Sequence, residues 1–187
     1  GDPLPPEREL AATLQVSRAG VREALRVLEG HGVLRSQVGA GAEAGTFVAA
    51  LPASALARFL RLHVALANFP LDDVVEARIV LERSSARFAA AHADADHLAA
   101  MRAALARMAV PGVGREEFND ADTDFHVAIA EAGGNRLVAD MTIAIRDSLR
   151  GPLLDALRQV TDFDAMAATL RMQHEDLYAA IEAGDGD

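Results

Sequence analysis

Cysteine, lysine and tryptophan are absent from this chain of 187 residues, and aromatic residues make up only 4% of it. Because cysteine is absent, disulfide frameworks and thiolate zinc sites are excluded, and any metal ion must be bound by histidine, aspartate or glutamate. No apolar stretch approaches the roughly 18–20 residues that a membrane-spanning helix needs. The first six residues lack the basic and apolar regions of a secretory signal. We therefore expect a cytoplasmic protein with no membrane partner.

An excess of positive charge is also lacking, since the net charge is −10. This balance disfavours nucleic acid as a partner, because phosphate contacts need basic side chains. The acidic excess is unevenly distributed, however: residues 1–50 carry a net charge of −1 and residues 51–187 a net charge of −9. The first 50 residues therefore remain compatible with DNA, and their arginines supply the bidentate group that binds guanine and phosphate.

Apolar residues are abundant, at 51% of the chain, and their spacing predicts the secondary structure. The N-terminal part predicts a helix, a tight turn, a second helix capped by Ser17, and a β-hairpin, over residues 7–14, 15–16, 17–30, 33–36 and 46–48. Six further helices follow, near residues 53–68, 71–91, 94–109, 115–132, 135–158 and 162–183. We expect a mainly α protein, with a winged helix-turn-helix in residues 1–50 and an all-α helical bundle in residues 51–187.

The predicted helix over residues 17–30 has two distinct faces. Four apolar residues would face the domain core: Val21, Ala24, Leu25 and Leu28. Three arginines follow one another at every fourth position, on a face roughly 110° away: Arg18, Arg22 and Arg26. This division suits a recognition helix in a DNA major groove. The spacing alone leaves open an ordinary solvated row of charges with Glu23 and Glu29 as partners.

Several segments of this half resemble the GntR family of bacterial transcription regulators: LPPERELA (residues 4–11), VSRAGVREAL (16–25), LEGHGVL (28–34) and GTFV (45–48). The resemblance implies contact with double-stranded operator DNA by the wing near Gly41 and by Arg8, Ser17, Arg18, Ala19, Gly20 and Arg22. Some relatives carry hydroxyl residues at the positions of Ala19 and Gly20, so their base readout does not transfer there. The resemblance also places the first helix of the family before Leu4.

In the second half, polar groups fall on apolar helix faces. On the helix near residues 115–132, Asp122 and His126 share the face of the large apolar residues and lie one turn apart. On the last helix, His174 occupies the corresponding apolar face. Such groups are costly in a core unless they are paired or bind a ligand. Together they predict a site for a divalent ion such as Zn, Ni, Mn or Fe. The alternative is an internal Asp122–His126 pair and an unrelated core histidine.

The segments RIVLE (78–82), DTDFH (122–126), AGGN (132–135) and, after His174, AIEAGD (180–185) resemble the FadR-type C-terminal domain of one large GntR subfamily. The resemblance implies that Asp122, His126 and His174 hold a metal ion under an effector pocket. The further histidine of the family pattern would either lie beyond Asp187 or be absent from the native protein. It also implies that the pocket includes Asn135 and Arg78, with Arg78 meeting an anionic effector. The alternative for Arg78 is an intrahelical pair with Glu82.

These observations predict a regulator, not an enzyme. We expect a homodimer on a palindromic operator, because a two-fold protein reads two half-sites. A small organic acid bound near the metal would shift the spacing of the two DNA-binding domains. Two alternatives remain: the same regulator with a metal-free pocket for a more apolar ligand, and a metal-dependent hydrolase. The hydrolase would lack a recognisable general base or nucleophile motif and would leave the N-terminal half unexplained.

Overall fold

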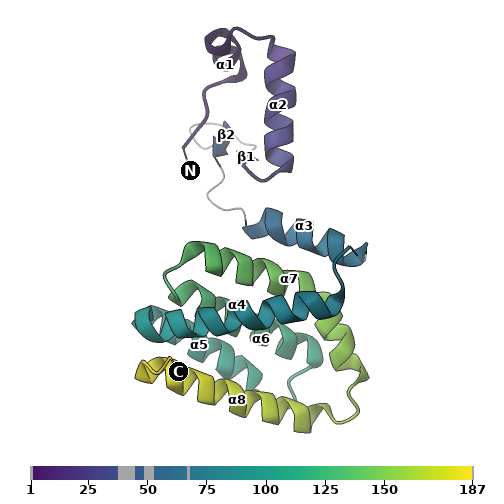
Figure 1. The fold of residues 1–187 in the computed structure, drawn as a ribbon, viewed down its shortest axis with the longest axis vertical. Helices are drawn as coiled ribbons and strands as arrows, with labels where there is room; N and C mark the ends of the chain where they lie inside the picture. Colours follow the sequence, from purple (N-terminus) through teal and green to yellow (C-terminus); the bar gives the residue numbers. More distant parts are fainter. Residues whose placement is uncertain (1, 38–44, 49–52, 67, 187) are drawn as a thin grey trace. The chain divides into compact units, whose positions relative to one another are not determined.

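A computed structural model of the chain describes residues 2–37, 45–48, 53–66 and 68–186 (Figure 1). Within them lie eight helices and two strands, in this order: α1 (Glu7–Leu14), α2 (Arg18–Gly30), β1 (Leu34–Gln37), β2 (Gly45–Val48), α3 (Ala53–Ala65), α4 (Leu71–His92), α5 (Ala95–Met108), α6 (Arg115–Ala132), α7 (Arg136–Gln159) and α8 (Phe163–Ala183). The predicted fold class is confirmed. The chain divides into two compact units, Gly1–Ala55 and Leu56–Asp187. Among the described residues, no helix is long and apolar enough to cross a membrane.

The first unit consists of α1, α2 and the antiparallel hairpin β1–β2, in which Leu34 pairs with Val48 and Gln37 with Gly45. The segment before α1 joins the hairpin as well, since the Leu4 amide donates to the Thr46 carbonyl at 2.7 Å. This addition was not predicted. The proposed wing tip at Gly41 lies outside the described residues.

Local chemistry explains where α2 begins. The Ser17 hydroxyl accepts a hydrogen bond from the Gly20 amide at 3.0 Å, as an N-cap should. Val21 is buried and Leu25 half-buried in this unit. The prediction that Ala24 and Leu28 face the core is wrong, because both are exposed, Leu28 by 39%. The neighbouring described elements, α1 and the hairpin, cover only the Val21 side of the apolar stripe.

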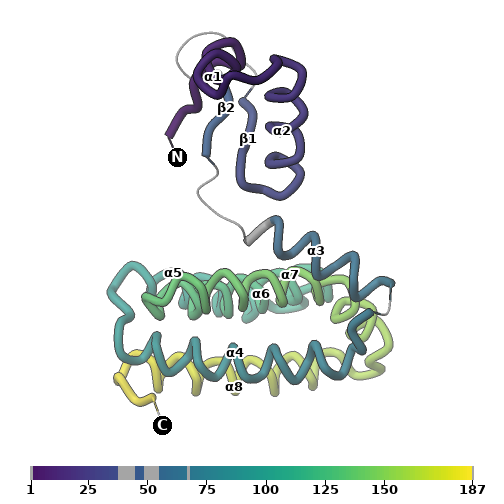
Figure 2. The backbone as a smooth tube through the Cα atoms, turned by 45° about the horizontal axis from the view of Figure 1, so that its top comes forward, coloured from purple at the N-terminus to yellow at the C-terminus, as the bar shows by residue number. Residues whose placement is uncertain are grey.

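The second unit is a helical bundle in which α4 to α8 lie side by side with their long axes roughly aligned (Figure 2). Helix α6 contacts α4, α5 and α7. Its residues Phe118, Phe125 and Ile129 are at most 2% exposed and form the centre of the core. Because α6 is enclosed by its neighbours, polar side chains on its inner face are held inside the bundle.

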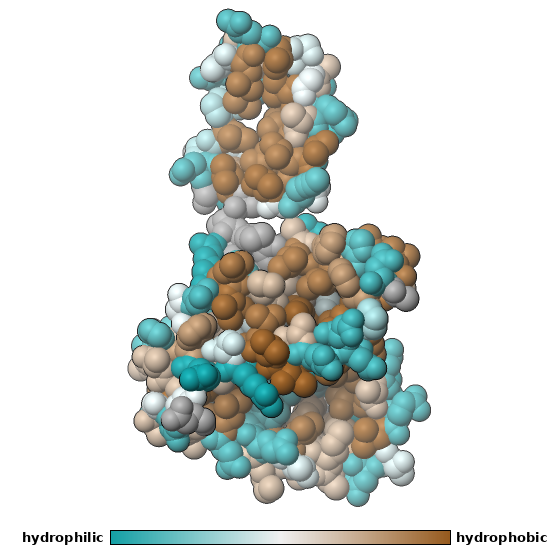
Figure 3. Space-filling model, in the orientation of Figure 1, coloured by the Kyte–Doolittle hydropathy of each residue, from teal (hydrophilic) through white to brown (hydrophobic). Residues whose placement is uncertain are grey.

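Helix α3 begins the bundle and has two apolar faces. Leu60 and Val64 pack inward against a small core cluster around Leu149. Phe59 and Leu62 are about half exposed, at 50% and 57%. Apolar residues accordingly reach the molecular surface where α3 lies (Figure 3). The inward face ties α3 to α4 and α7.

Candidate metal centre and DNA-binding helix

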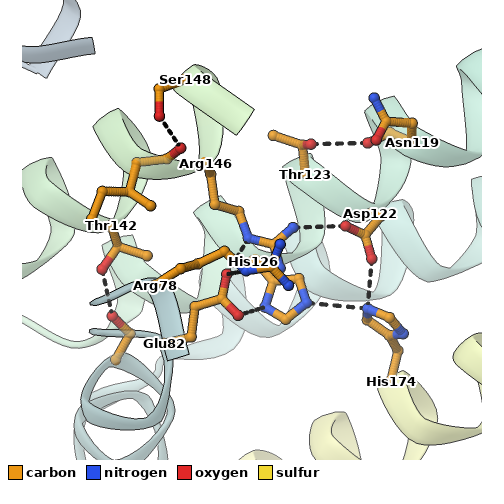
Figure 4. A network of polar contacts seen from close by, with 12 residues as sticks. Arg78, Glu82, Asn119, Asp122, Thr123, His126, Thr142, Arg146, Ser148 and His174 are labelled. Carbon is orange, nitrogen blue, oxygen red and sulfur yellow. Dashed lines mark hydrogen bonds and ion pairs between the residues drawn. The ribbon is translucent and has the colours of Figure 1, made fainter. Parts of the chain in front are cut away.

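The structure brings together the three residues singled out as metal ligands. Asp122 and His126 extend from α6, and His174 extends from α8 (Figure 4). One ligand atom from each residue lies within 4.8 Å of the others. His174 Nε2 is 2.9 Å from Asp122 Oδ1 and 3.1 Å from His126 Nε2. Atoms that bind one ion at about 2.0–2.1 Å lie roughly 3 Å from one another, so these spacings fit a shared metal ion.

Core packing holds the two imidazoles in place. The Phe125 ring lies edge-to-face with His126 and His174, with ring centroids 5.4 Å and 5.0 Å apart. His174 Nδ1 donates to the Leu170 carbonyl one turn earlier, because a carbonyl can only accept. In a neutral imidazole this bond leaves the lone pair on Nε2, the atom that faces Asp122 and His126. The backbone thus sets the tautomer that a metal ligand needs.

Two further residues surround the ligands, and sequence analysis missed their role. Arg146 on α7 donates to Asp122 Oδ2 at 2.6 Å and, through Nε, to Glu82 on α4. Glu82 Oε2 lies 3.9 Å from His126 Nδ1 and so orients that ring electrostatically. Arg146 is only 2% exposed. One signal was present in the sequence: Arg146 lies one helical turn from the buried residue Thr142, on the core-facing side of α7.

The surroundings set the protonation of both α6 ligands. Burial raises the pKa of the Asp122 carboxyl, but the interaction with His174 and the positive charge of Arg146 outweigh it, and the pKa lies below its ordinary value. Burial and the charge of Arg146 together hold the pKa of His126 well below 6.5. At neutral pH Asp122 is therefore anionic and His126 neutral, the forms in which both bind metal ions.

Arg78 lies beside this cluster with an unsatisfied donor. Its Nε is 3.2 Å from Glu82 Oε1, so the intrahelical ion pair considered from sequence is present. The pair is not aligned as a hydrogen bond, and the buried Nε–H has no hydrogen-bond partner among the described residues. Arg78 also lines a cavity of about 240 Å³ together with Asp122, His126 and His174. A buried guanidinium donor facing a cavity is suited to binding an anion.

Asn135, the other expected effector contact, is not brought to this place. It is exposed and caps α7, where its side chain accepts a hydrogen bond from the Val138 amide at 3.2 Å. It does not line the cavity that contains Arg78. The structure therefore gives Asn135 the role of a helix cap.

In the first unit, the described residues expected at DNA lie in the first turns of α2 and, for Arg8, at the start of α1. Arg8, Arg18, Ala19 and Gly20 are exposed, and neither Arg8 nor Arg18 has an ion pair among the described residues. Arg22 is held by Glu7 of α1, with an NH2–Oε2 distance of 2.9 Å. That hydrogen bond lowers the pKa of Glu7 below its ordinary value. Contact of Arg22 with DNA, as expected from the sequence, would require it to exchange this partner or to keep it as a support.

Comparison with known proteins matches each of the two units to a protein family. The model of the bacterial regulatory proteins of the gntR family matches residues 1–43, and that of the FCD domain matches residues 73–187. The HTH-type transcriptional regulator LutR of Bacillus subtilis is 28% identical over all of this chain and 84% of its own length. The HTH-type transcriptional repressor NanR of Edwardsiella tarda is 32% identical over all of this chain and 71% of its own. The galactonate operon transcriptional repressor of Escherichia coli is 31% identical over all of this chain and 80% of its own length.

Solved structures share the fold. A Streptococcus agalactiae GntR protein superimposes with a TM-score of 0.63 at 21% identity, covering all of this chain and 82% of the other. The two domain matches and the relatives agree on a transcription regulator rather than an enzyme. The chain therefore belongs to the GntR family of bacterial regulators and carries an FCD domain after its DNA-binding unit.

Proposed function

We propose that this regulator binds a palindromic operator as a homodimer in the cytoplasm, and that a small carboxylate bound beside a divalent metal ion changes its affinity for that operator. The observation that carries the proposal is the convergence of Asp122, His126 and His174, one ligand atom from each within 4.8 Å, beside the unsatisfied Nε–H of Arg78. Exposed residues at the start of α2, including Arg18, would contact the DNA.

The ligand set indicates which metals fit. One carboxylate and two imidazoles suit Zn, Ni, Mn or Fe, and exclude metals that require thiolate. When bound, the ion would supply a Lewis-acidic centre that holds a carboxylate oxygen of the effector. Glu82 and the Leu170 carbonyl orient the two imidazoles, as outer partners do in protein metal sites.

The charges of the site favour an anionic effector. The positive charges of Arg78 and Arg146 are balanced by the negative charges of Glu82 and Asp122. A divalent ion adds two positive charges to a largely buried place, and an anion reduces that excess. Two relatives are named for operons of galactonate and L-lactate dehydrogenase, both of which refer to carboxylic acids.

The connection along the chain suggests how the effector acts. Arg78 and Glu82 belong to α4, which follows α3 directly, and α3 leads back to the first unit. A carboxylate that binds Arg78 more tightly in one position of α4 would bias α3 toward the corresponding position. In a homodimer, this bias would alter the separation of the two α2 helices and thus the fit to two half-sites.

A metal-free pocket in the same regulator is the second candidate. It is favoured by Arg146, which already neutralises Asp122 through a hydrogen bond of 2.6 Å. The anion would then bind Arg78 alone. The two candidates differ in metal content and in whether removal of metal weakens effector binding.

The first experiment is metal analysis by plasma mass spectrometry of protein purified without chelators or metal resins. We expect close to one equivalent of Zn, Ni, Mn or Fe in the parent and none in Asp122→Ala/His126→Ala. Glu131→Ala, an exposed acidic residue on the same helix, is the control and should keep the metal. Equal metal content in the parent and the double variant would reject the site.

The same preparations then test the switch. Operator DNA is selected from a random library, and its affinity is measured by fluorescence anisotropy with and without small carboxylic acids. We expect an acid that binds the parent to change operator affinity, and to do so far less in Asp122→Ala/His126→Ala. Operator affinity that is unchanged by every acid that binds would contradict the proposed regulation.

A further inference from the structure

A second cavity, of about 210 Å³, adjoins the metal centre. It shares Arg78, Asp122 and Leu170 with the cavity that contains the histidine ligands. Both cavities are lined by residues of α4, α6, α7 and α8. A ligand held by its carboxylate at Arg78 therefore has a defined space for the rest of its structure.

This second cavity, called the apolar chamber below, is lined mainly by hydrocarbon. Phe118 of α6, Leu153 and Leu157 of α7 and Leu170 of α8 form its apolar walls. Beyond the shared Arg78 and Asp122, the remaining lining residue that the structure describes is polar.

That residue is Asn119, and its amide nitrogen already donates to the Arg150 carbonyl at 3.2 Å. Its carbonyl oxygen and its second N–H are the groups that remain for a ligand. A ligand with several hydroxyl groups would lose water in the chamber without finding enough partners, whereas a hydrocarbon group loses no hydrogen bonds. The chamber therefore discriminates between acids by their substituents.

We propose that the effector is a monocarboxylate with a hydrocarbon tail of about four to six carbons or a phenyl ring, a size set by the observation that an apolar cavity of about 150 Å³ holds benzene. Its carboxylate lies at the Arg78 and Asp122 end and its tail in the apolar chamber. The reverse orientation would place a charge among Leu153, Leu157 and Phe118, which is far more costly. The inference rests on the proposed function and narrows its effector class.

The test is calorimetric titration of the parent protein, as purified and after addition of zinc, with acetate, butanoate, pentanoate, hexanoate and phenylacetate. Galactonate serves as the hydroxylated acid with the same number of carbons as hexanoate. Affinity should rise about fourfold for each methylene group up to about six carbons. Galactonate should bind about tenfold or more weakly than hexanoate, because its hydroxyl groups lack partners in the chamber.

Variants of the chamber wall extend the test. Leu153→Phe should shift the optimum to shorter acids, and Leu157→Ala should shift it to longer ones. Leu137→Phe, at a position of α7 that is 68% exposed, is the control and should change nothing. Circular dichroism confirms which variants are folded. If only one of the two chamber variants folds, that variant alone is sufficient for the test.

The outcomes separate this inference from the proposed function. If all acids bind with similar affinity, or if galactonate binds more tightly than hexanoate, the hydrocarbon tail is rejected and the carboxylate site stands. If no acid binds, acetate included, the carboxylate site itself is rejected and the inference fails with it. Loss of all binding in Arg78→Ala, with chain-length dependence in the parent, supports both.

Discussion

Arg146 determines the charge balance inside the bundle. Its guanidinium is 2% exposed and contacts carboxylates from two different helices, Asp122 and Glu82. Each carboxylate also has a second partner, respectively His174 and Arg78. Removing one member of a buried ion pair leaves an uncompensated charge, which costs more than the pair itself contributes. Loss of the Arg146 charge is therefore expected to destabilise the folded bundle.

Arg146→Met tests this role, since it keeps much of the volume and removes the charge. We expect the free energy of unfolding to fall by roughly 3–5 kcal/mol, because two buried carboxylates lose their common partner. Added zinc should recover part of the loss by supplying positive charge at Asp122. Urea denaturation with and without zinc measures both effects.

Arg150→Met is the matched control for this substitution. Arg150 also lies on α7 and pairs with a carboxylate of α6, Asp120, at 3.3 Å, but both side chains are 44% exposed. An exposed pair contributes about 0–1 kcal/mol. Equal losses in the two variants would show that burial of Arg146 carries no special weight.

At the scale of the helices, spacing along the sequence predicted the orientation of side chains but not the neighbours they meet. Asp122 and His126 were expected to face inward because each residue turns a helix by about 100°, and His174 followed the same rule. Glu82 and Arg146 join the site only because α4 and α7 pack against α6. The core-facing position of Arg146 on α7 was a signal, but periodicity does not show which residues of distant segments meet, so these two partners were missed.

The same limit applies to the first unit. Helical spacing grouped Val21, Ala24, Leu25 and Leu28 on one face of α2, but which of them are covered depends on other segments. Val21 is buried and Leu28 is exposed, although both fit the pattern. The Glu7–Arg22 contact also joins two helices that are adjacent in the fold and 15 residues apart in sequence. Local periodicity could not have predicted either result.

Substitution of Arg22 on α2 tests whether this helix contacts DNA bases. Arg22→Ala should weaken binding to a selected operator by roughly 1–3 kcal/mol if Arg22 makes a bidentate base contact. Binding to random DNA should change little. Arg26→Ala is the control, since Arg26 is 70% exposed and lies in the same arginine row. Anisotropy titrations at one fixed salt concentration measure the affinities of the parent and both variants for operator and random DNA.

Equal losses on operator and random DNA would instead indicate that Arg22 contacts phosphate. The Glu7 pair does not prevent either contact, because an exposed ion pair of this kind contributes at most about 1 kcal/mol. DNA phosphates and bases can replace it.

At the scale of the whole chain, the net charge is divided unevenly between the two halves. Residues 1–50 carry −1 of the net charge and residues 51–187 carry −9. The acidic bundle is repelled by DNA phosphate, so the exposed arginines at the start of α2 would provide the attractive surface. This distribution fits a protein in which one unit binds DNA and the other responds to a small molecule.

The buried guanidinium of Arg146 also has a consequence for how the bundle opens. Its hydrogen bonds join α7 to α4 and α6, so none of the three helices can separate without exposing a charged group that has lost its partner. Amide protons at the centres of these helices should therefore exchange with deuterium through one common opening reaction. In Arg146→Met, we expect exchange in α7 to become faster and independent of α6, as hydrogen-exchange mass spectrometry would record.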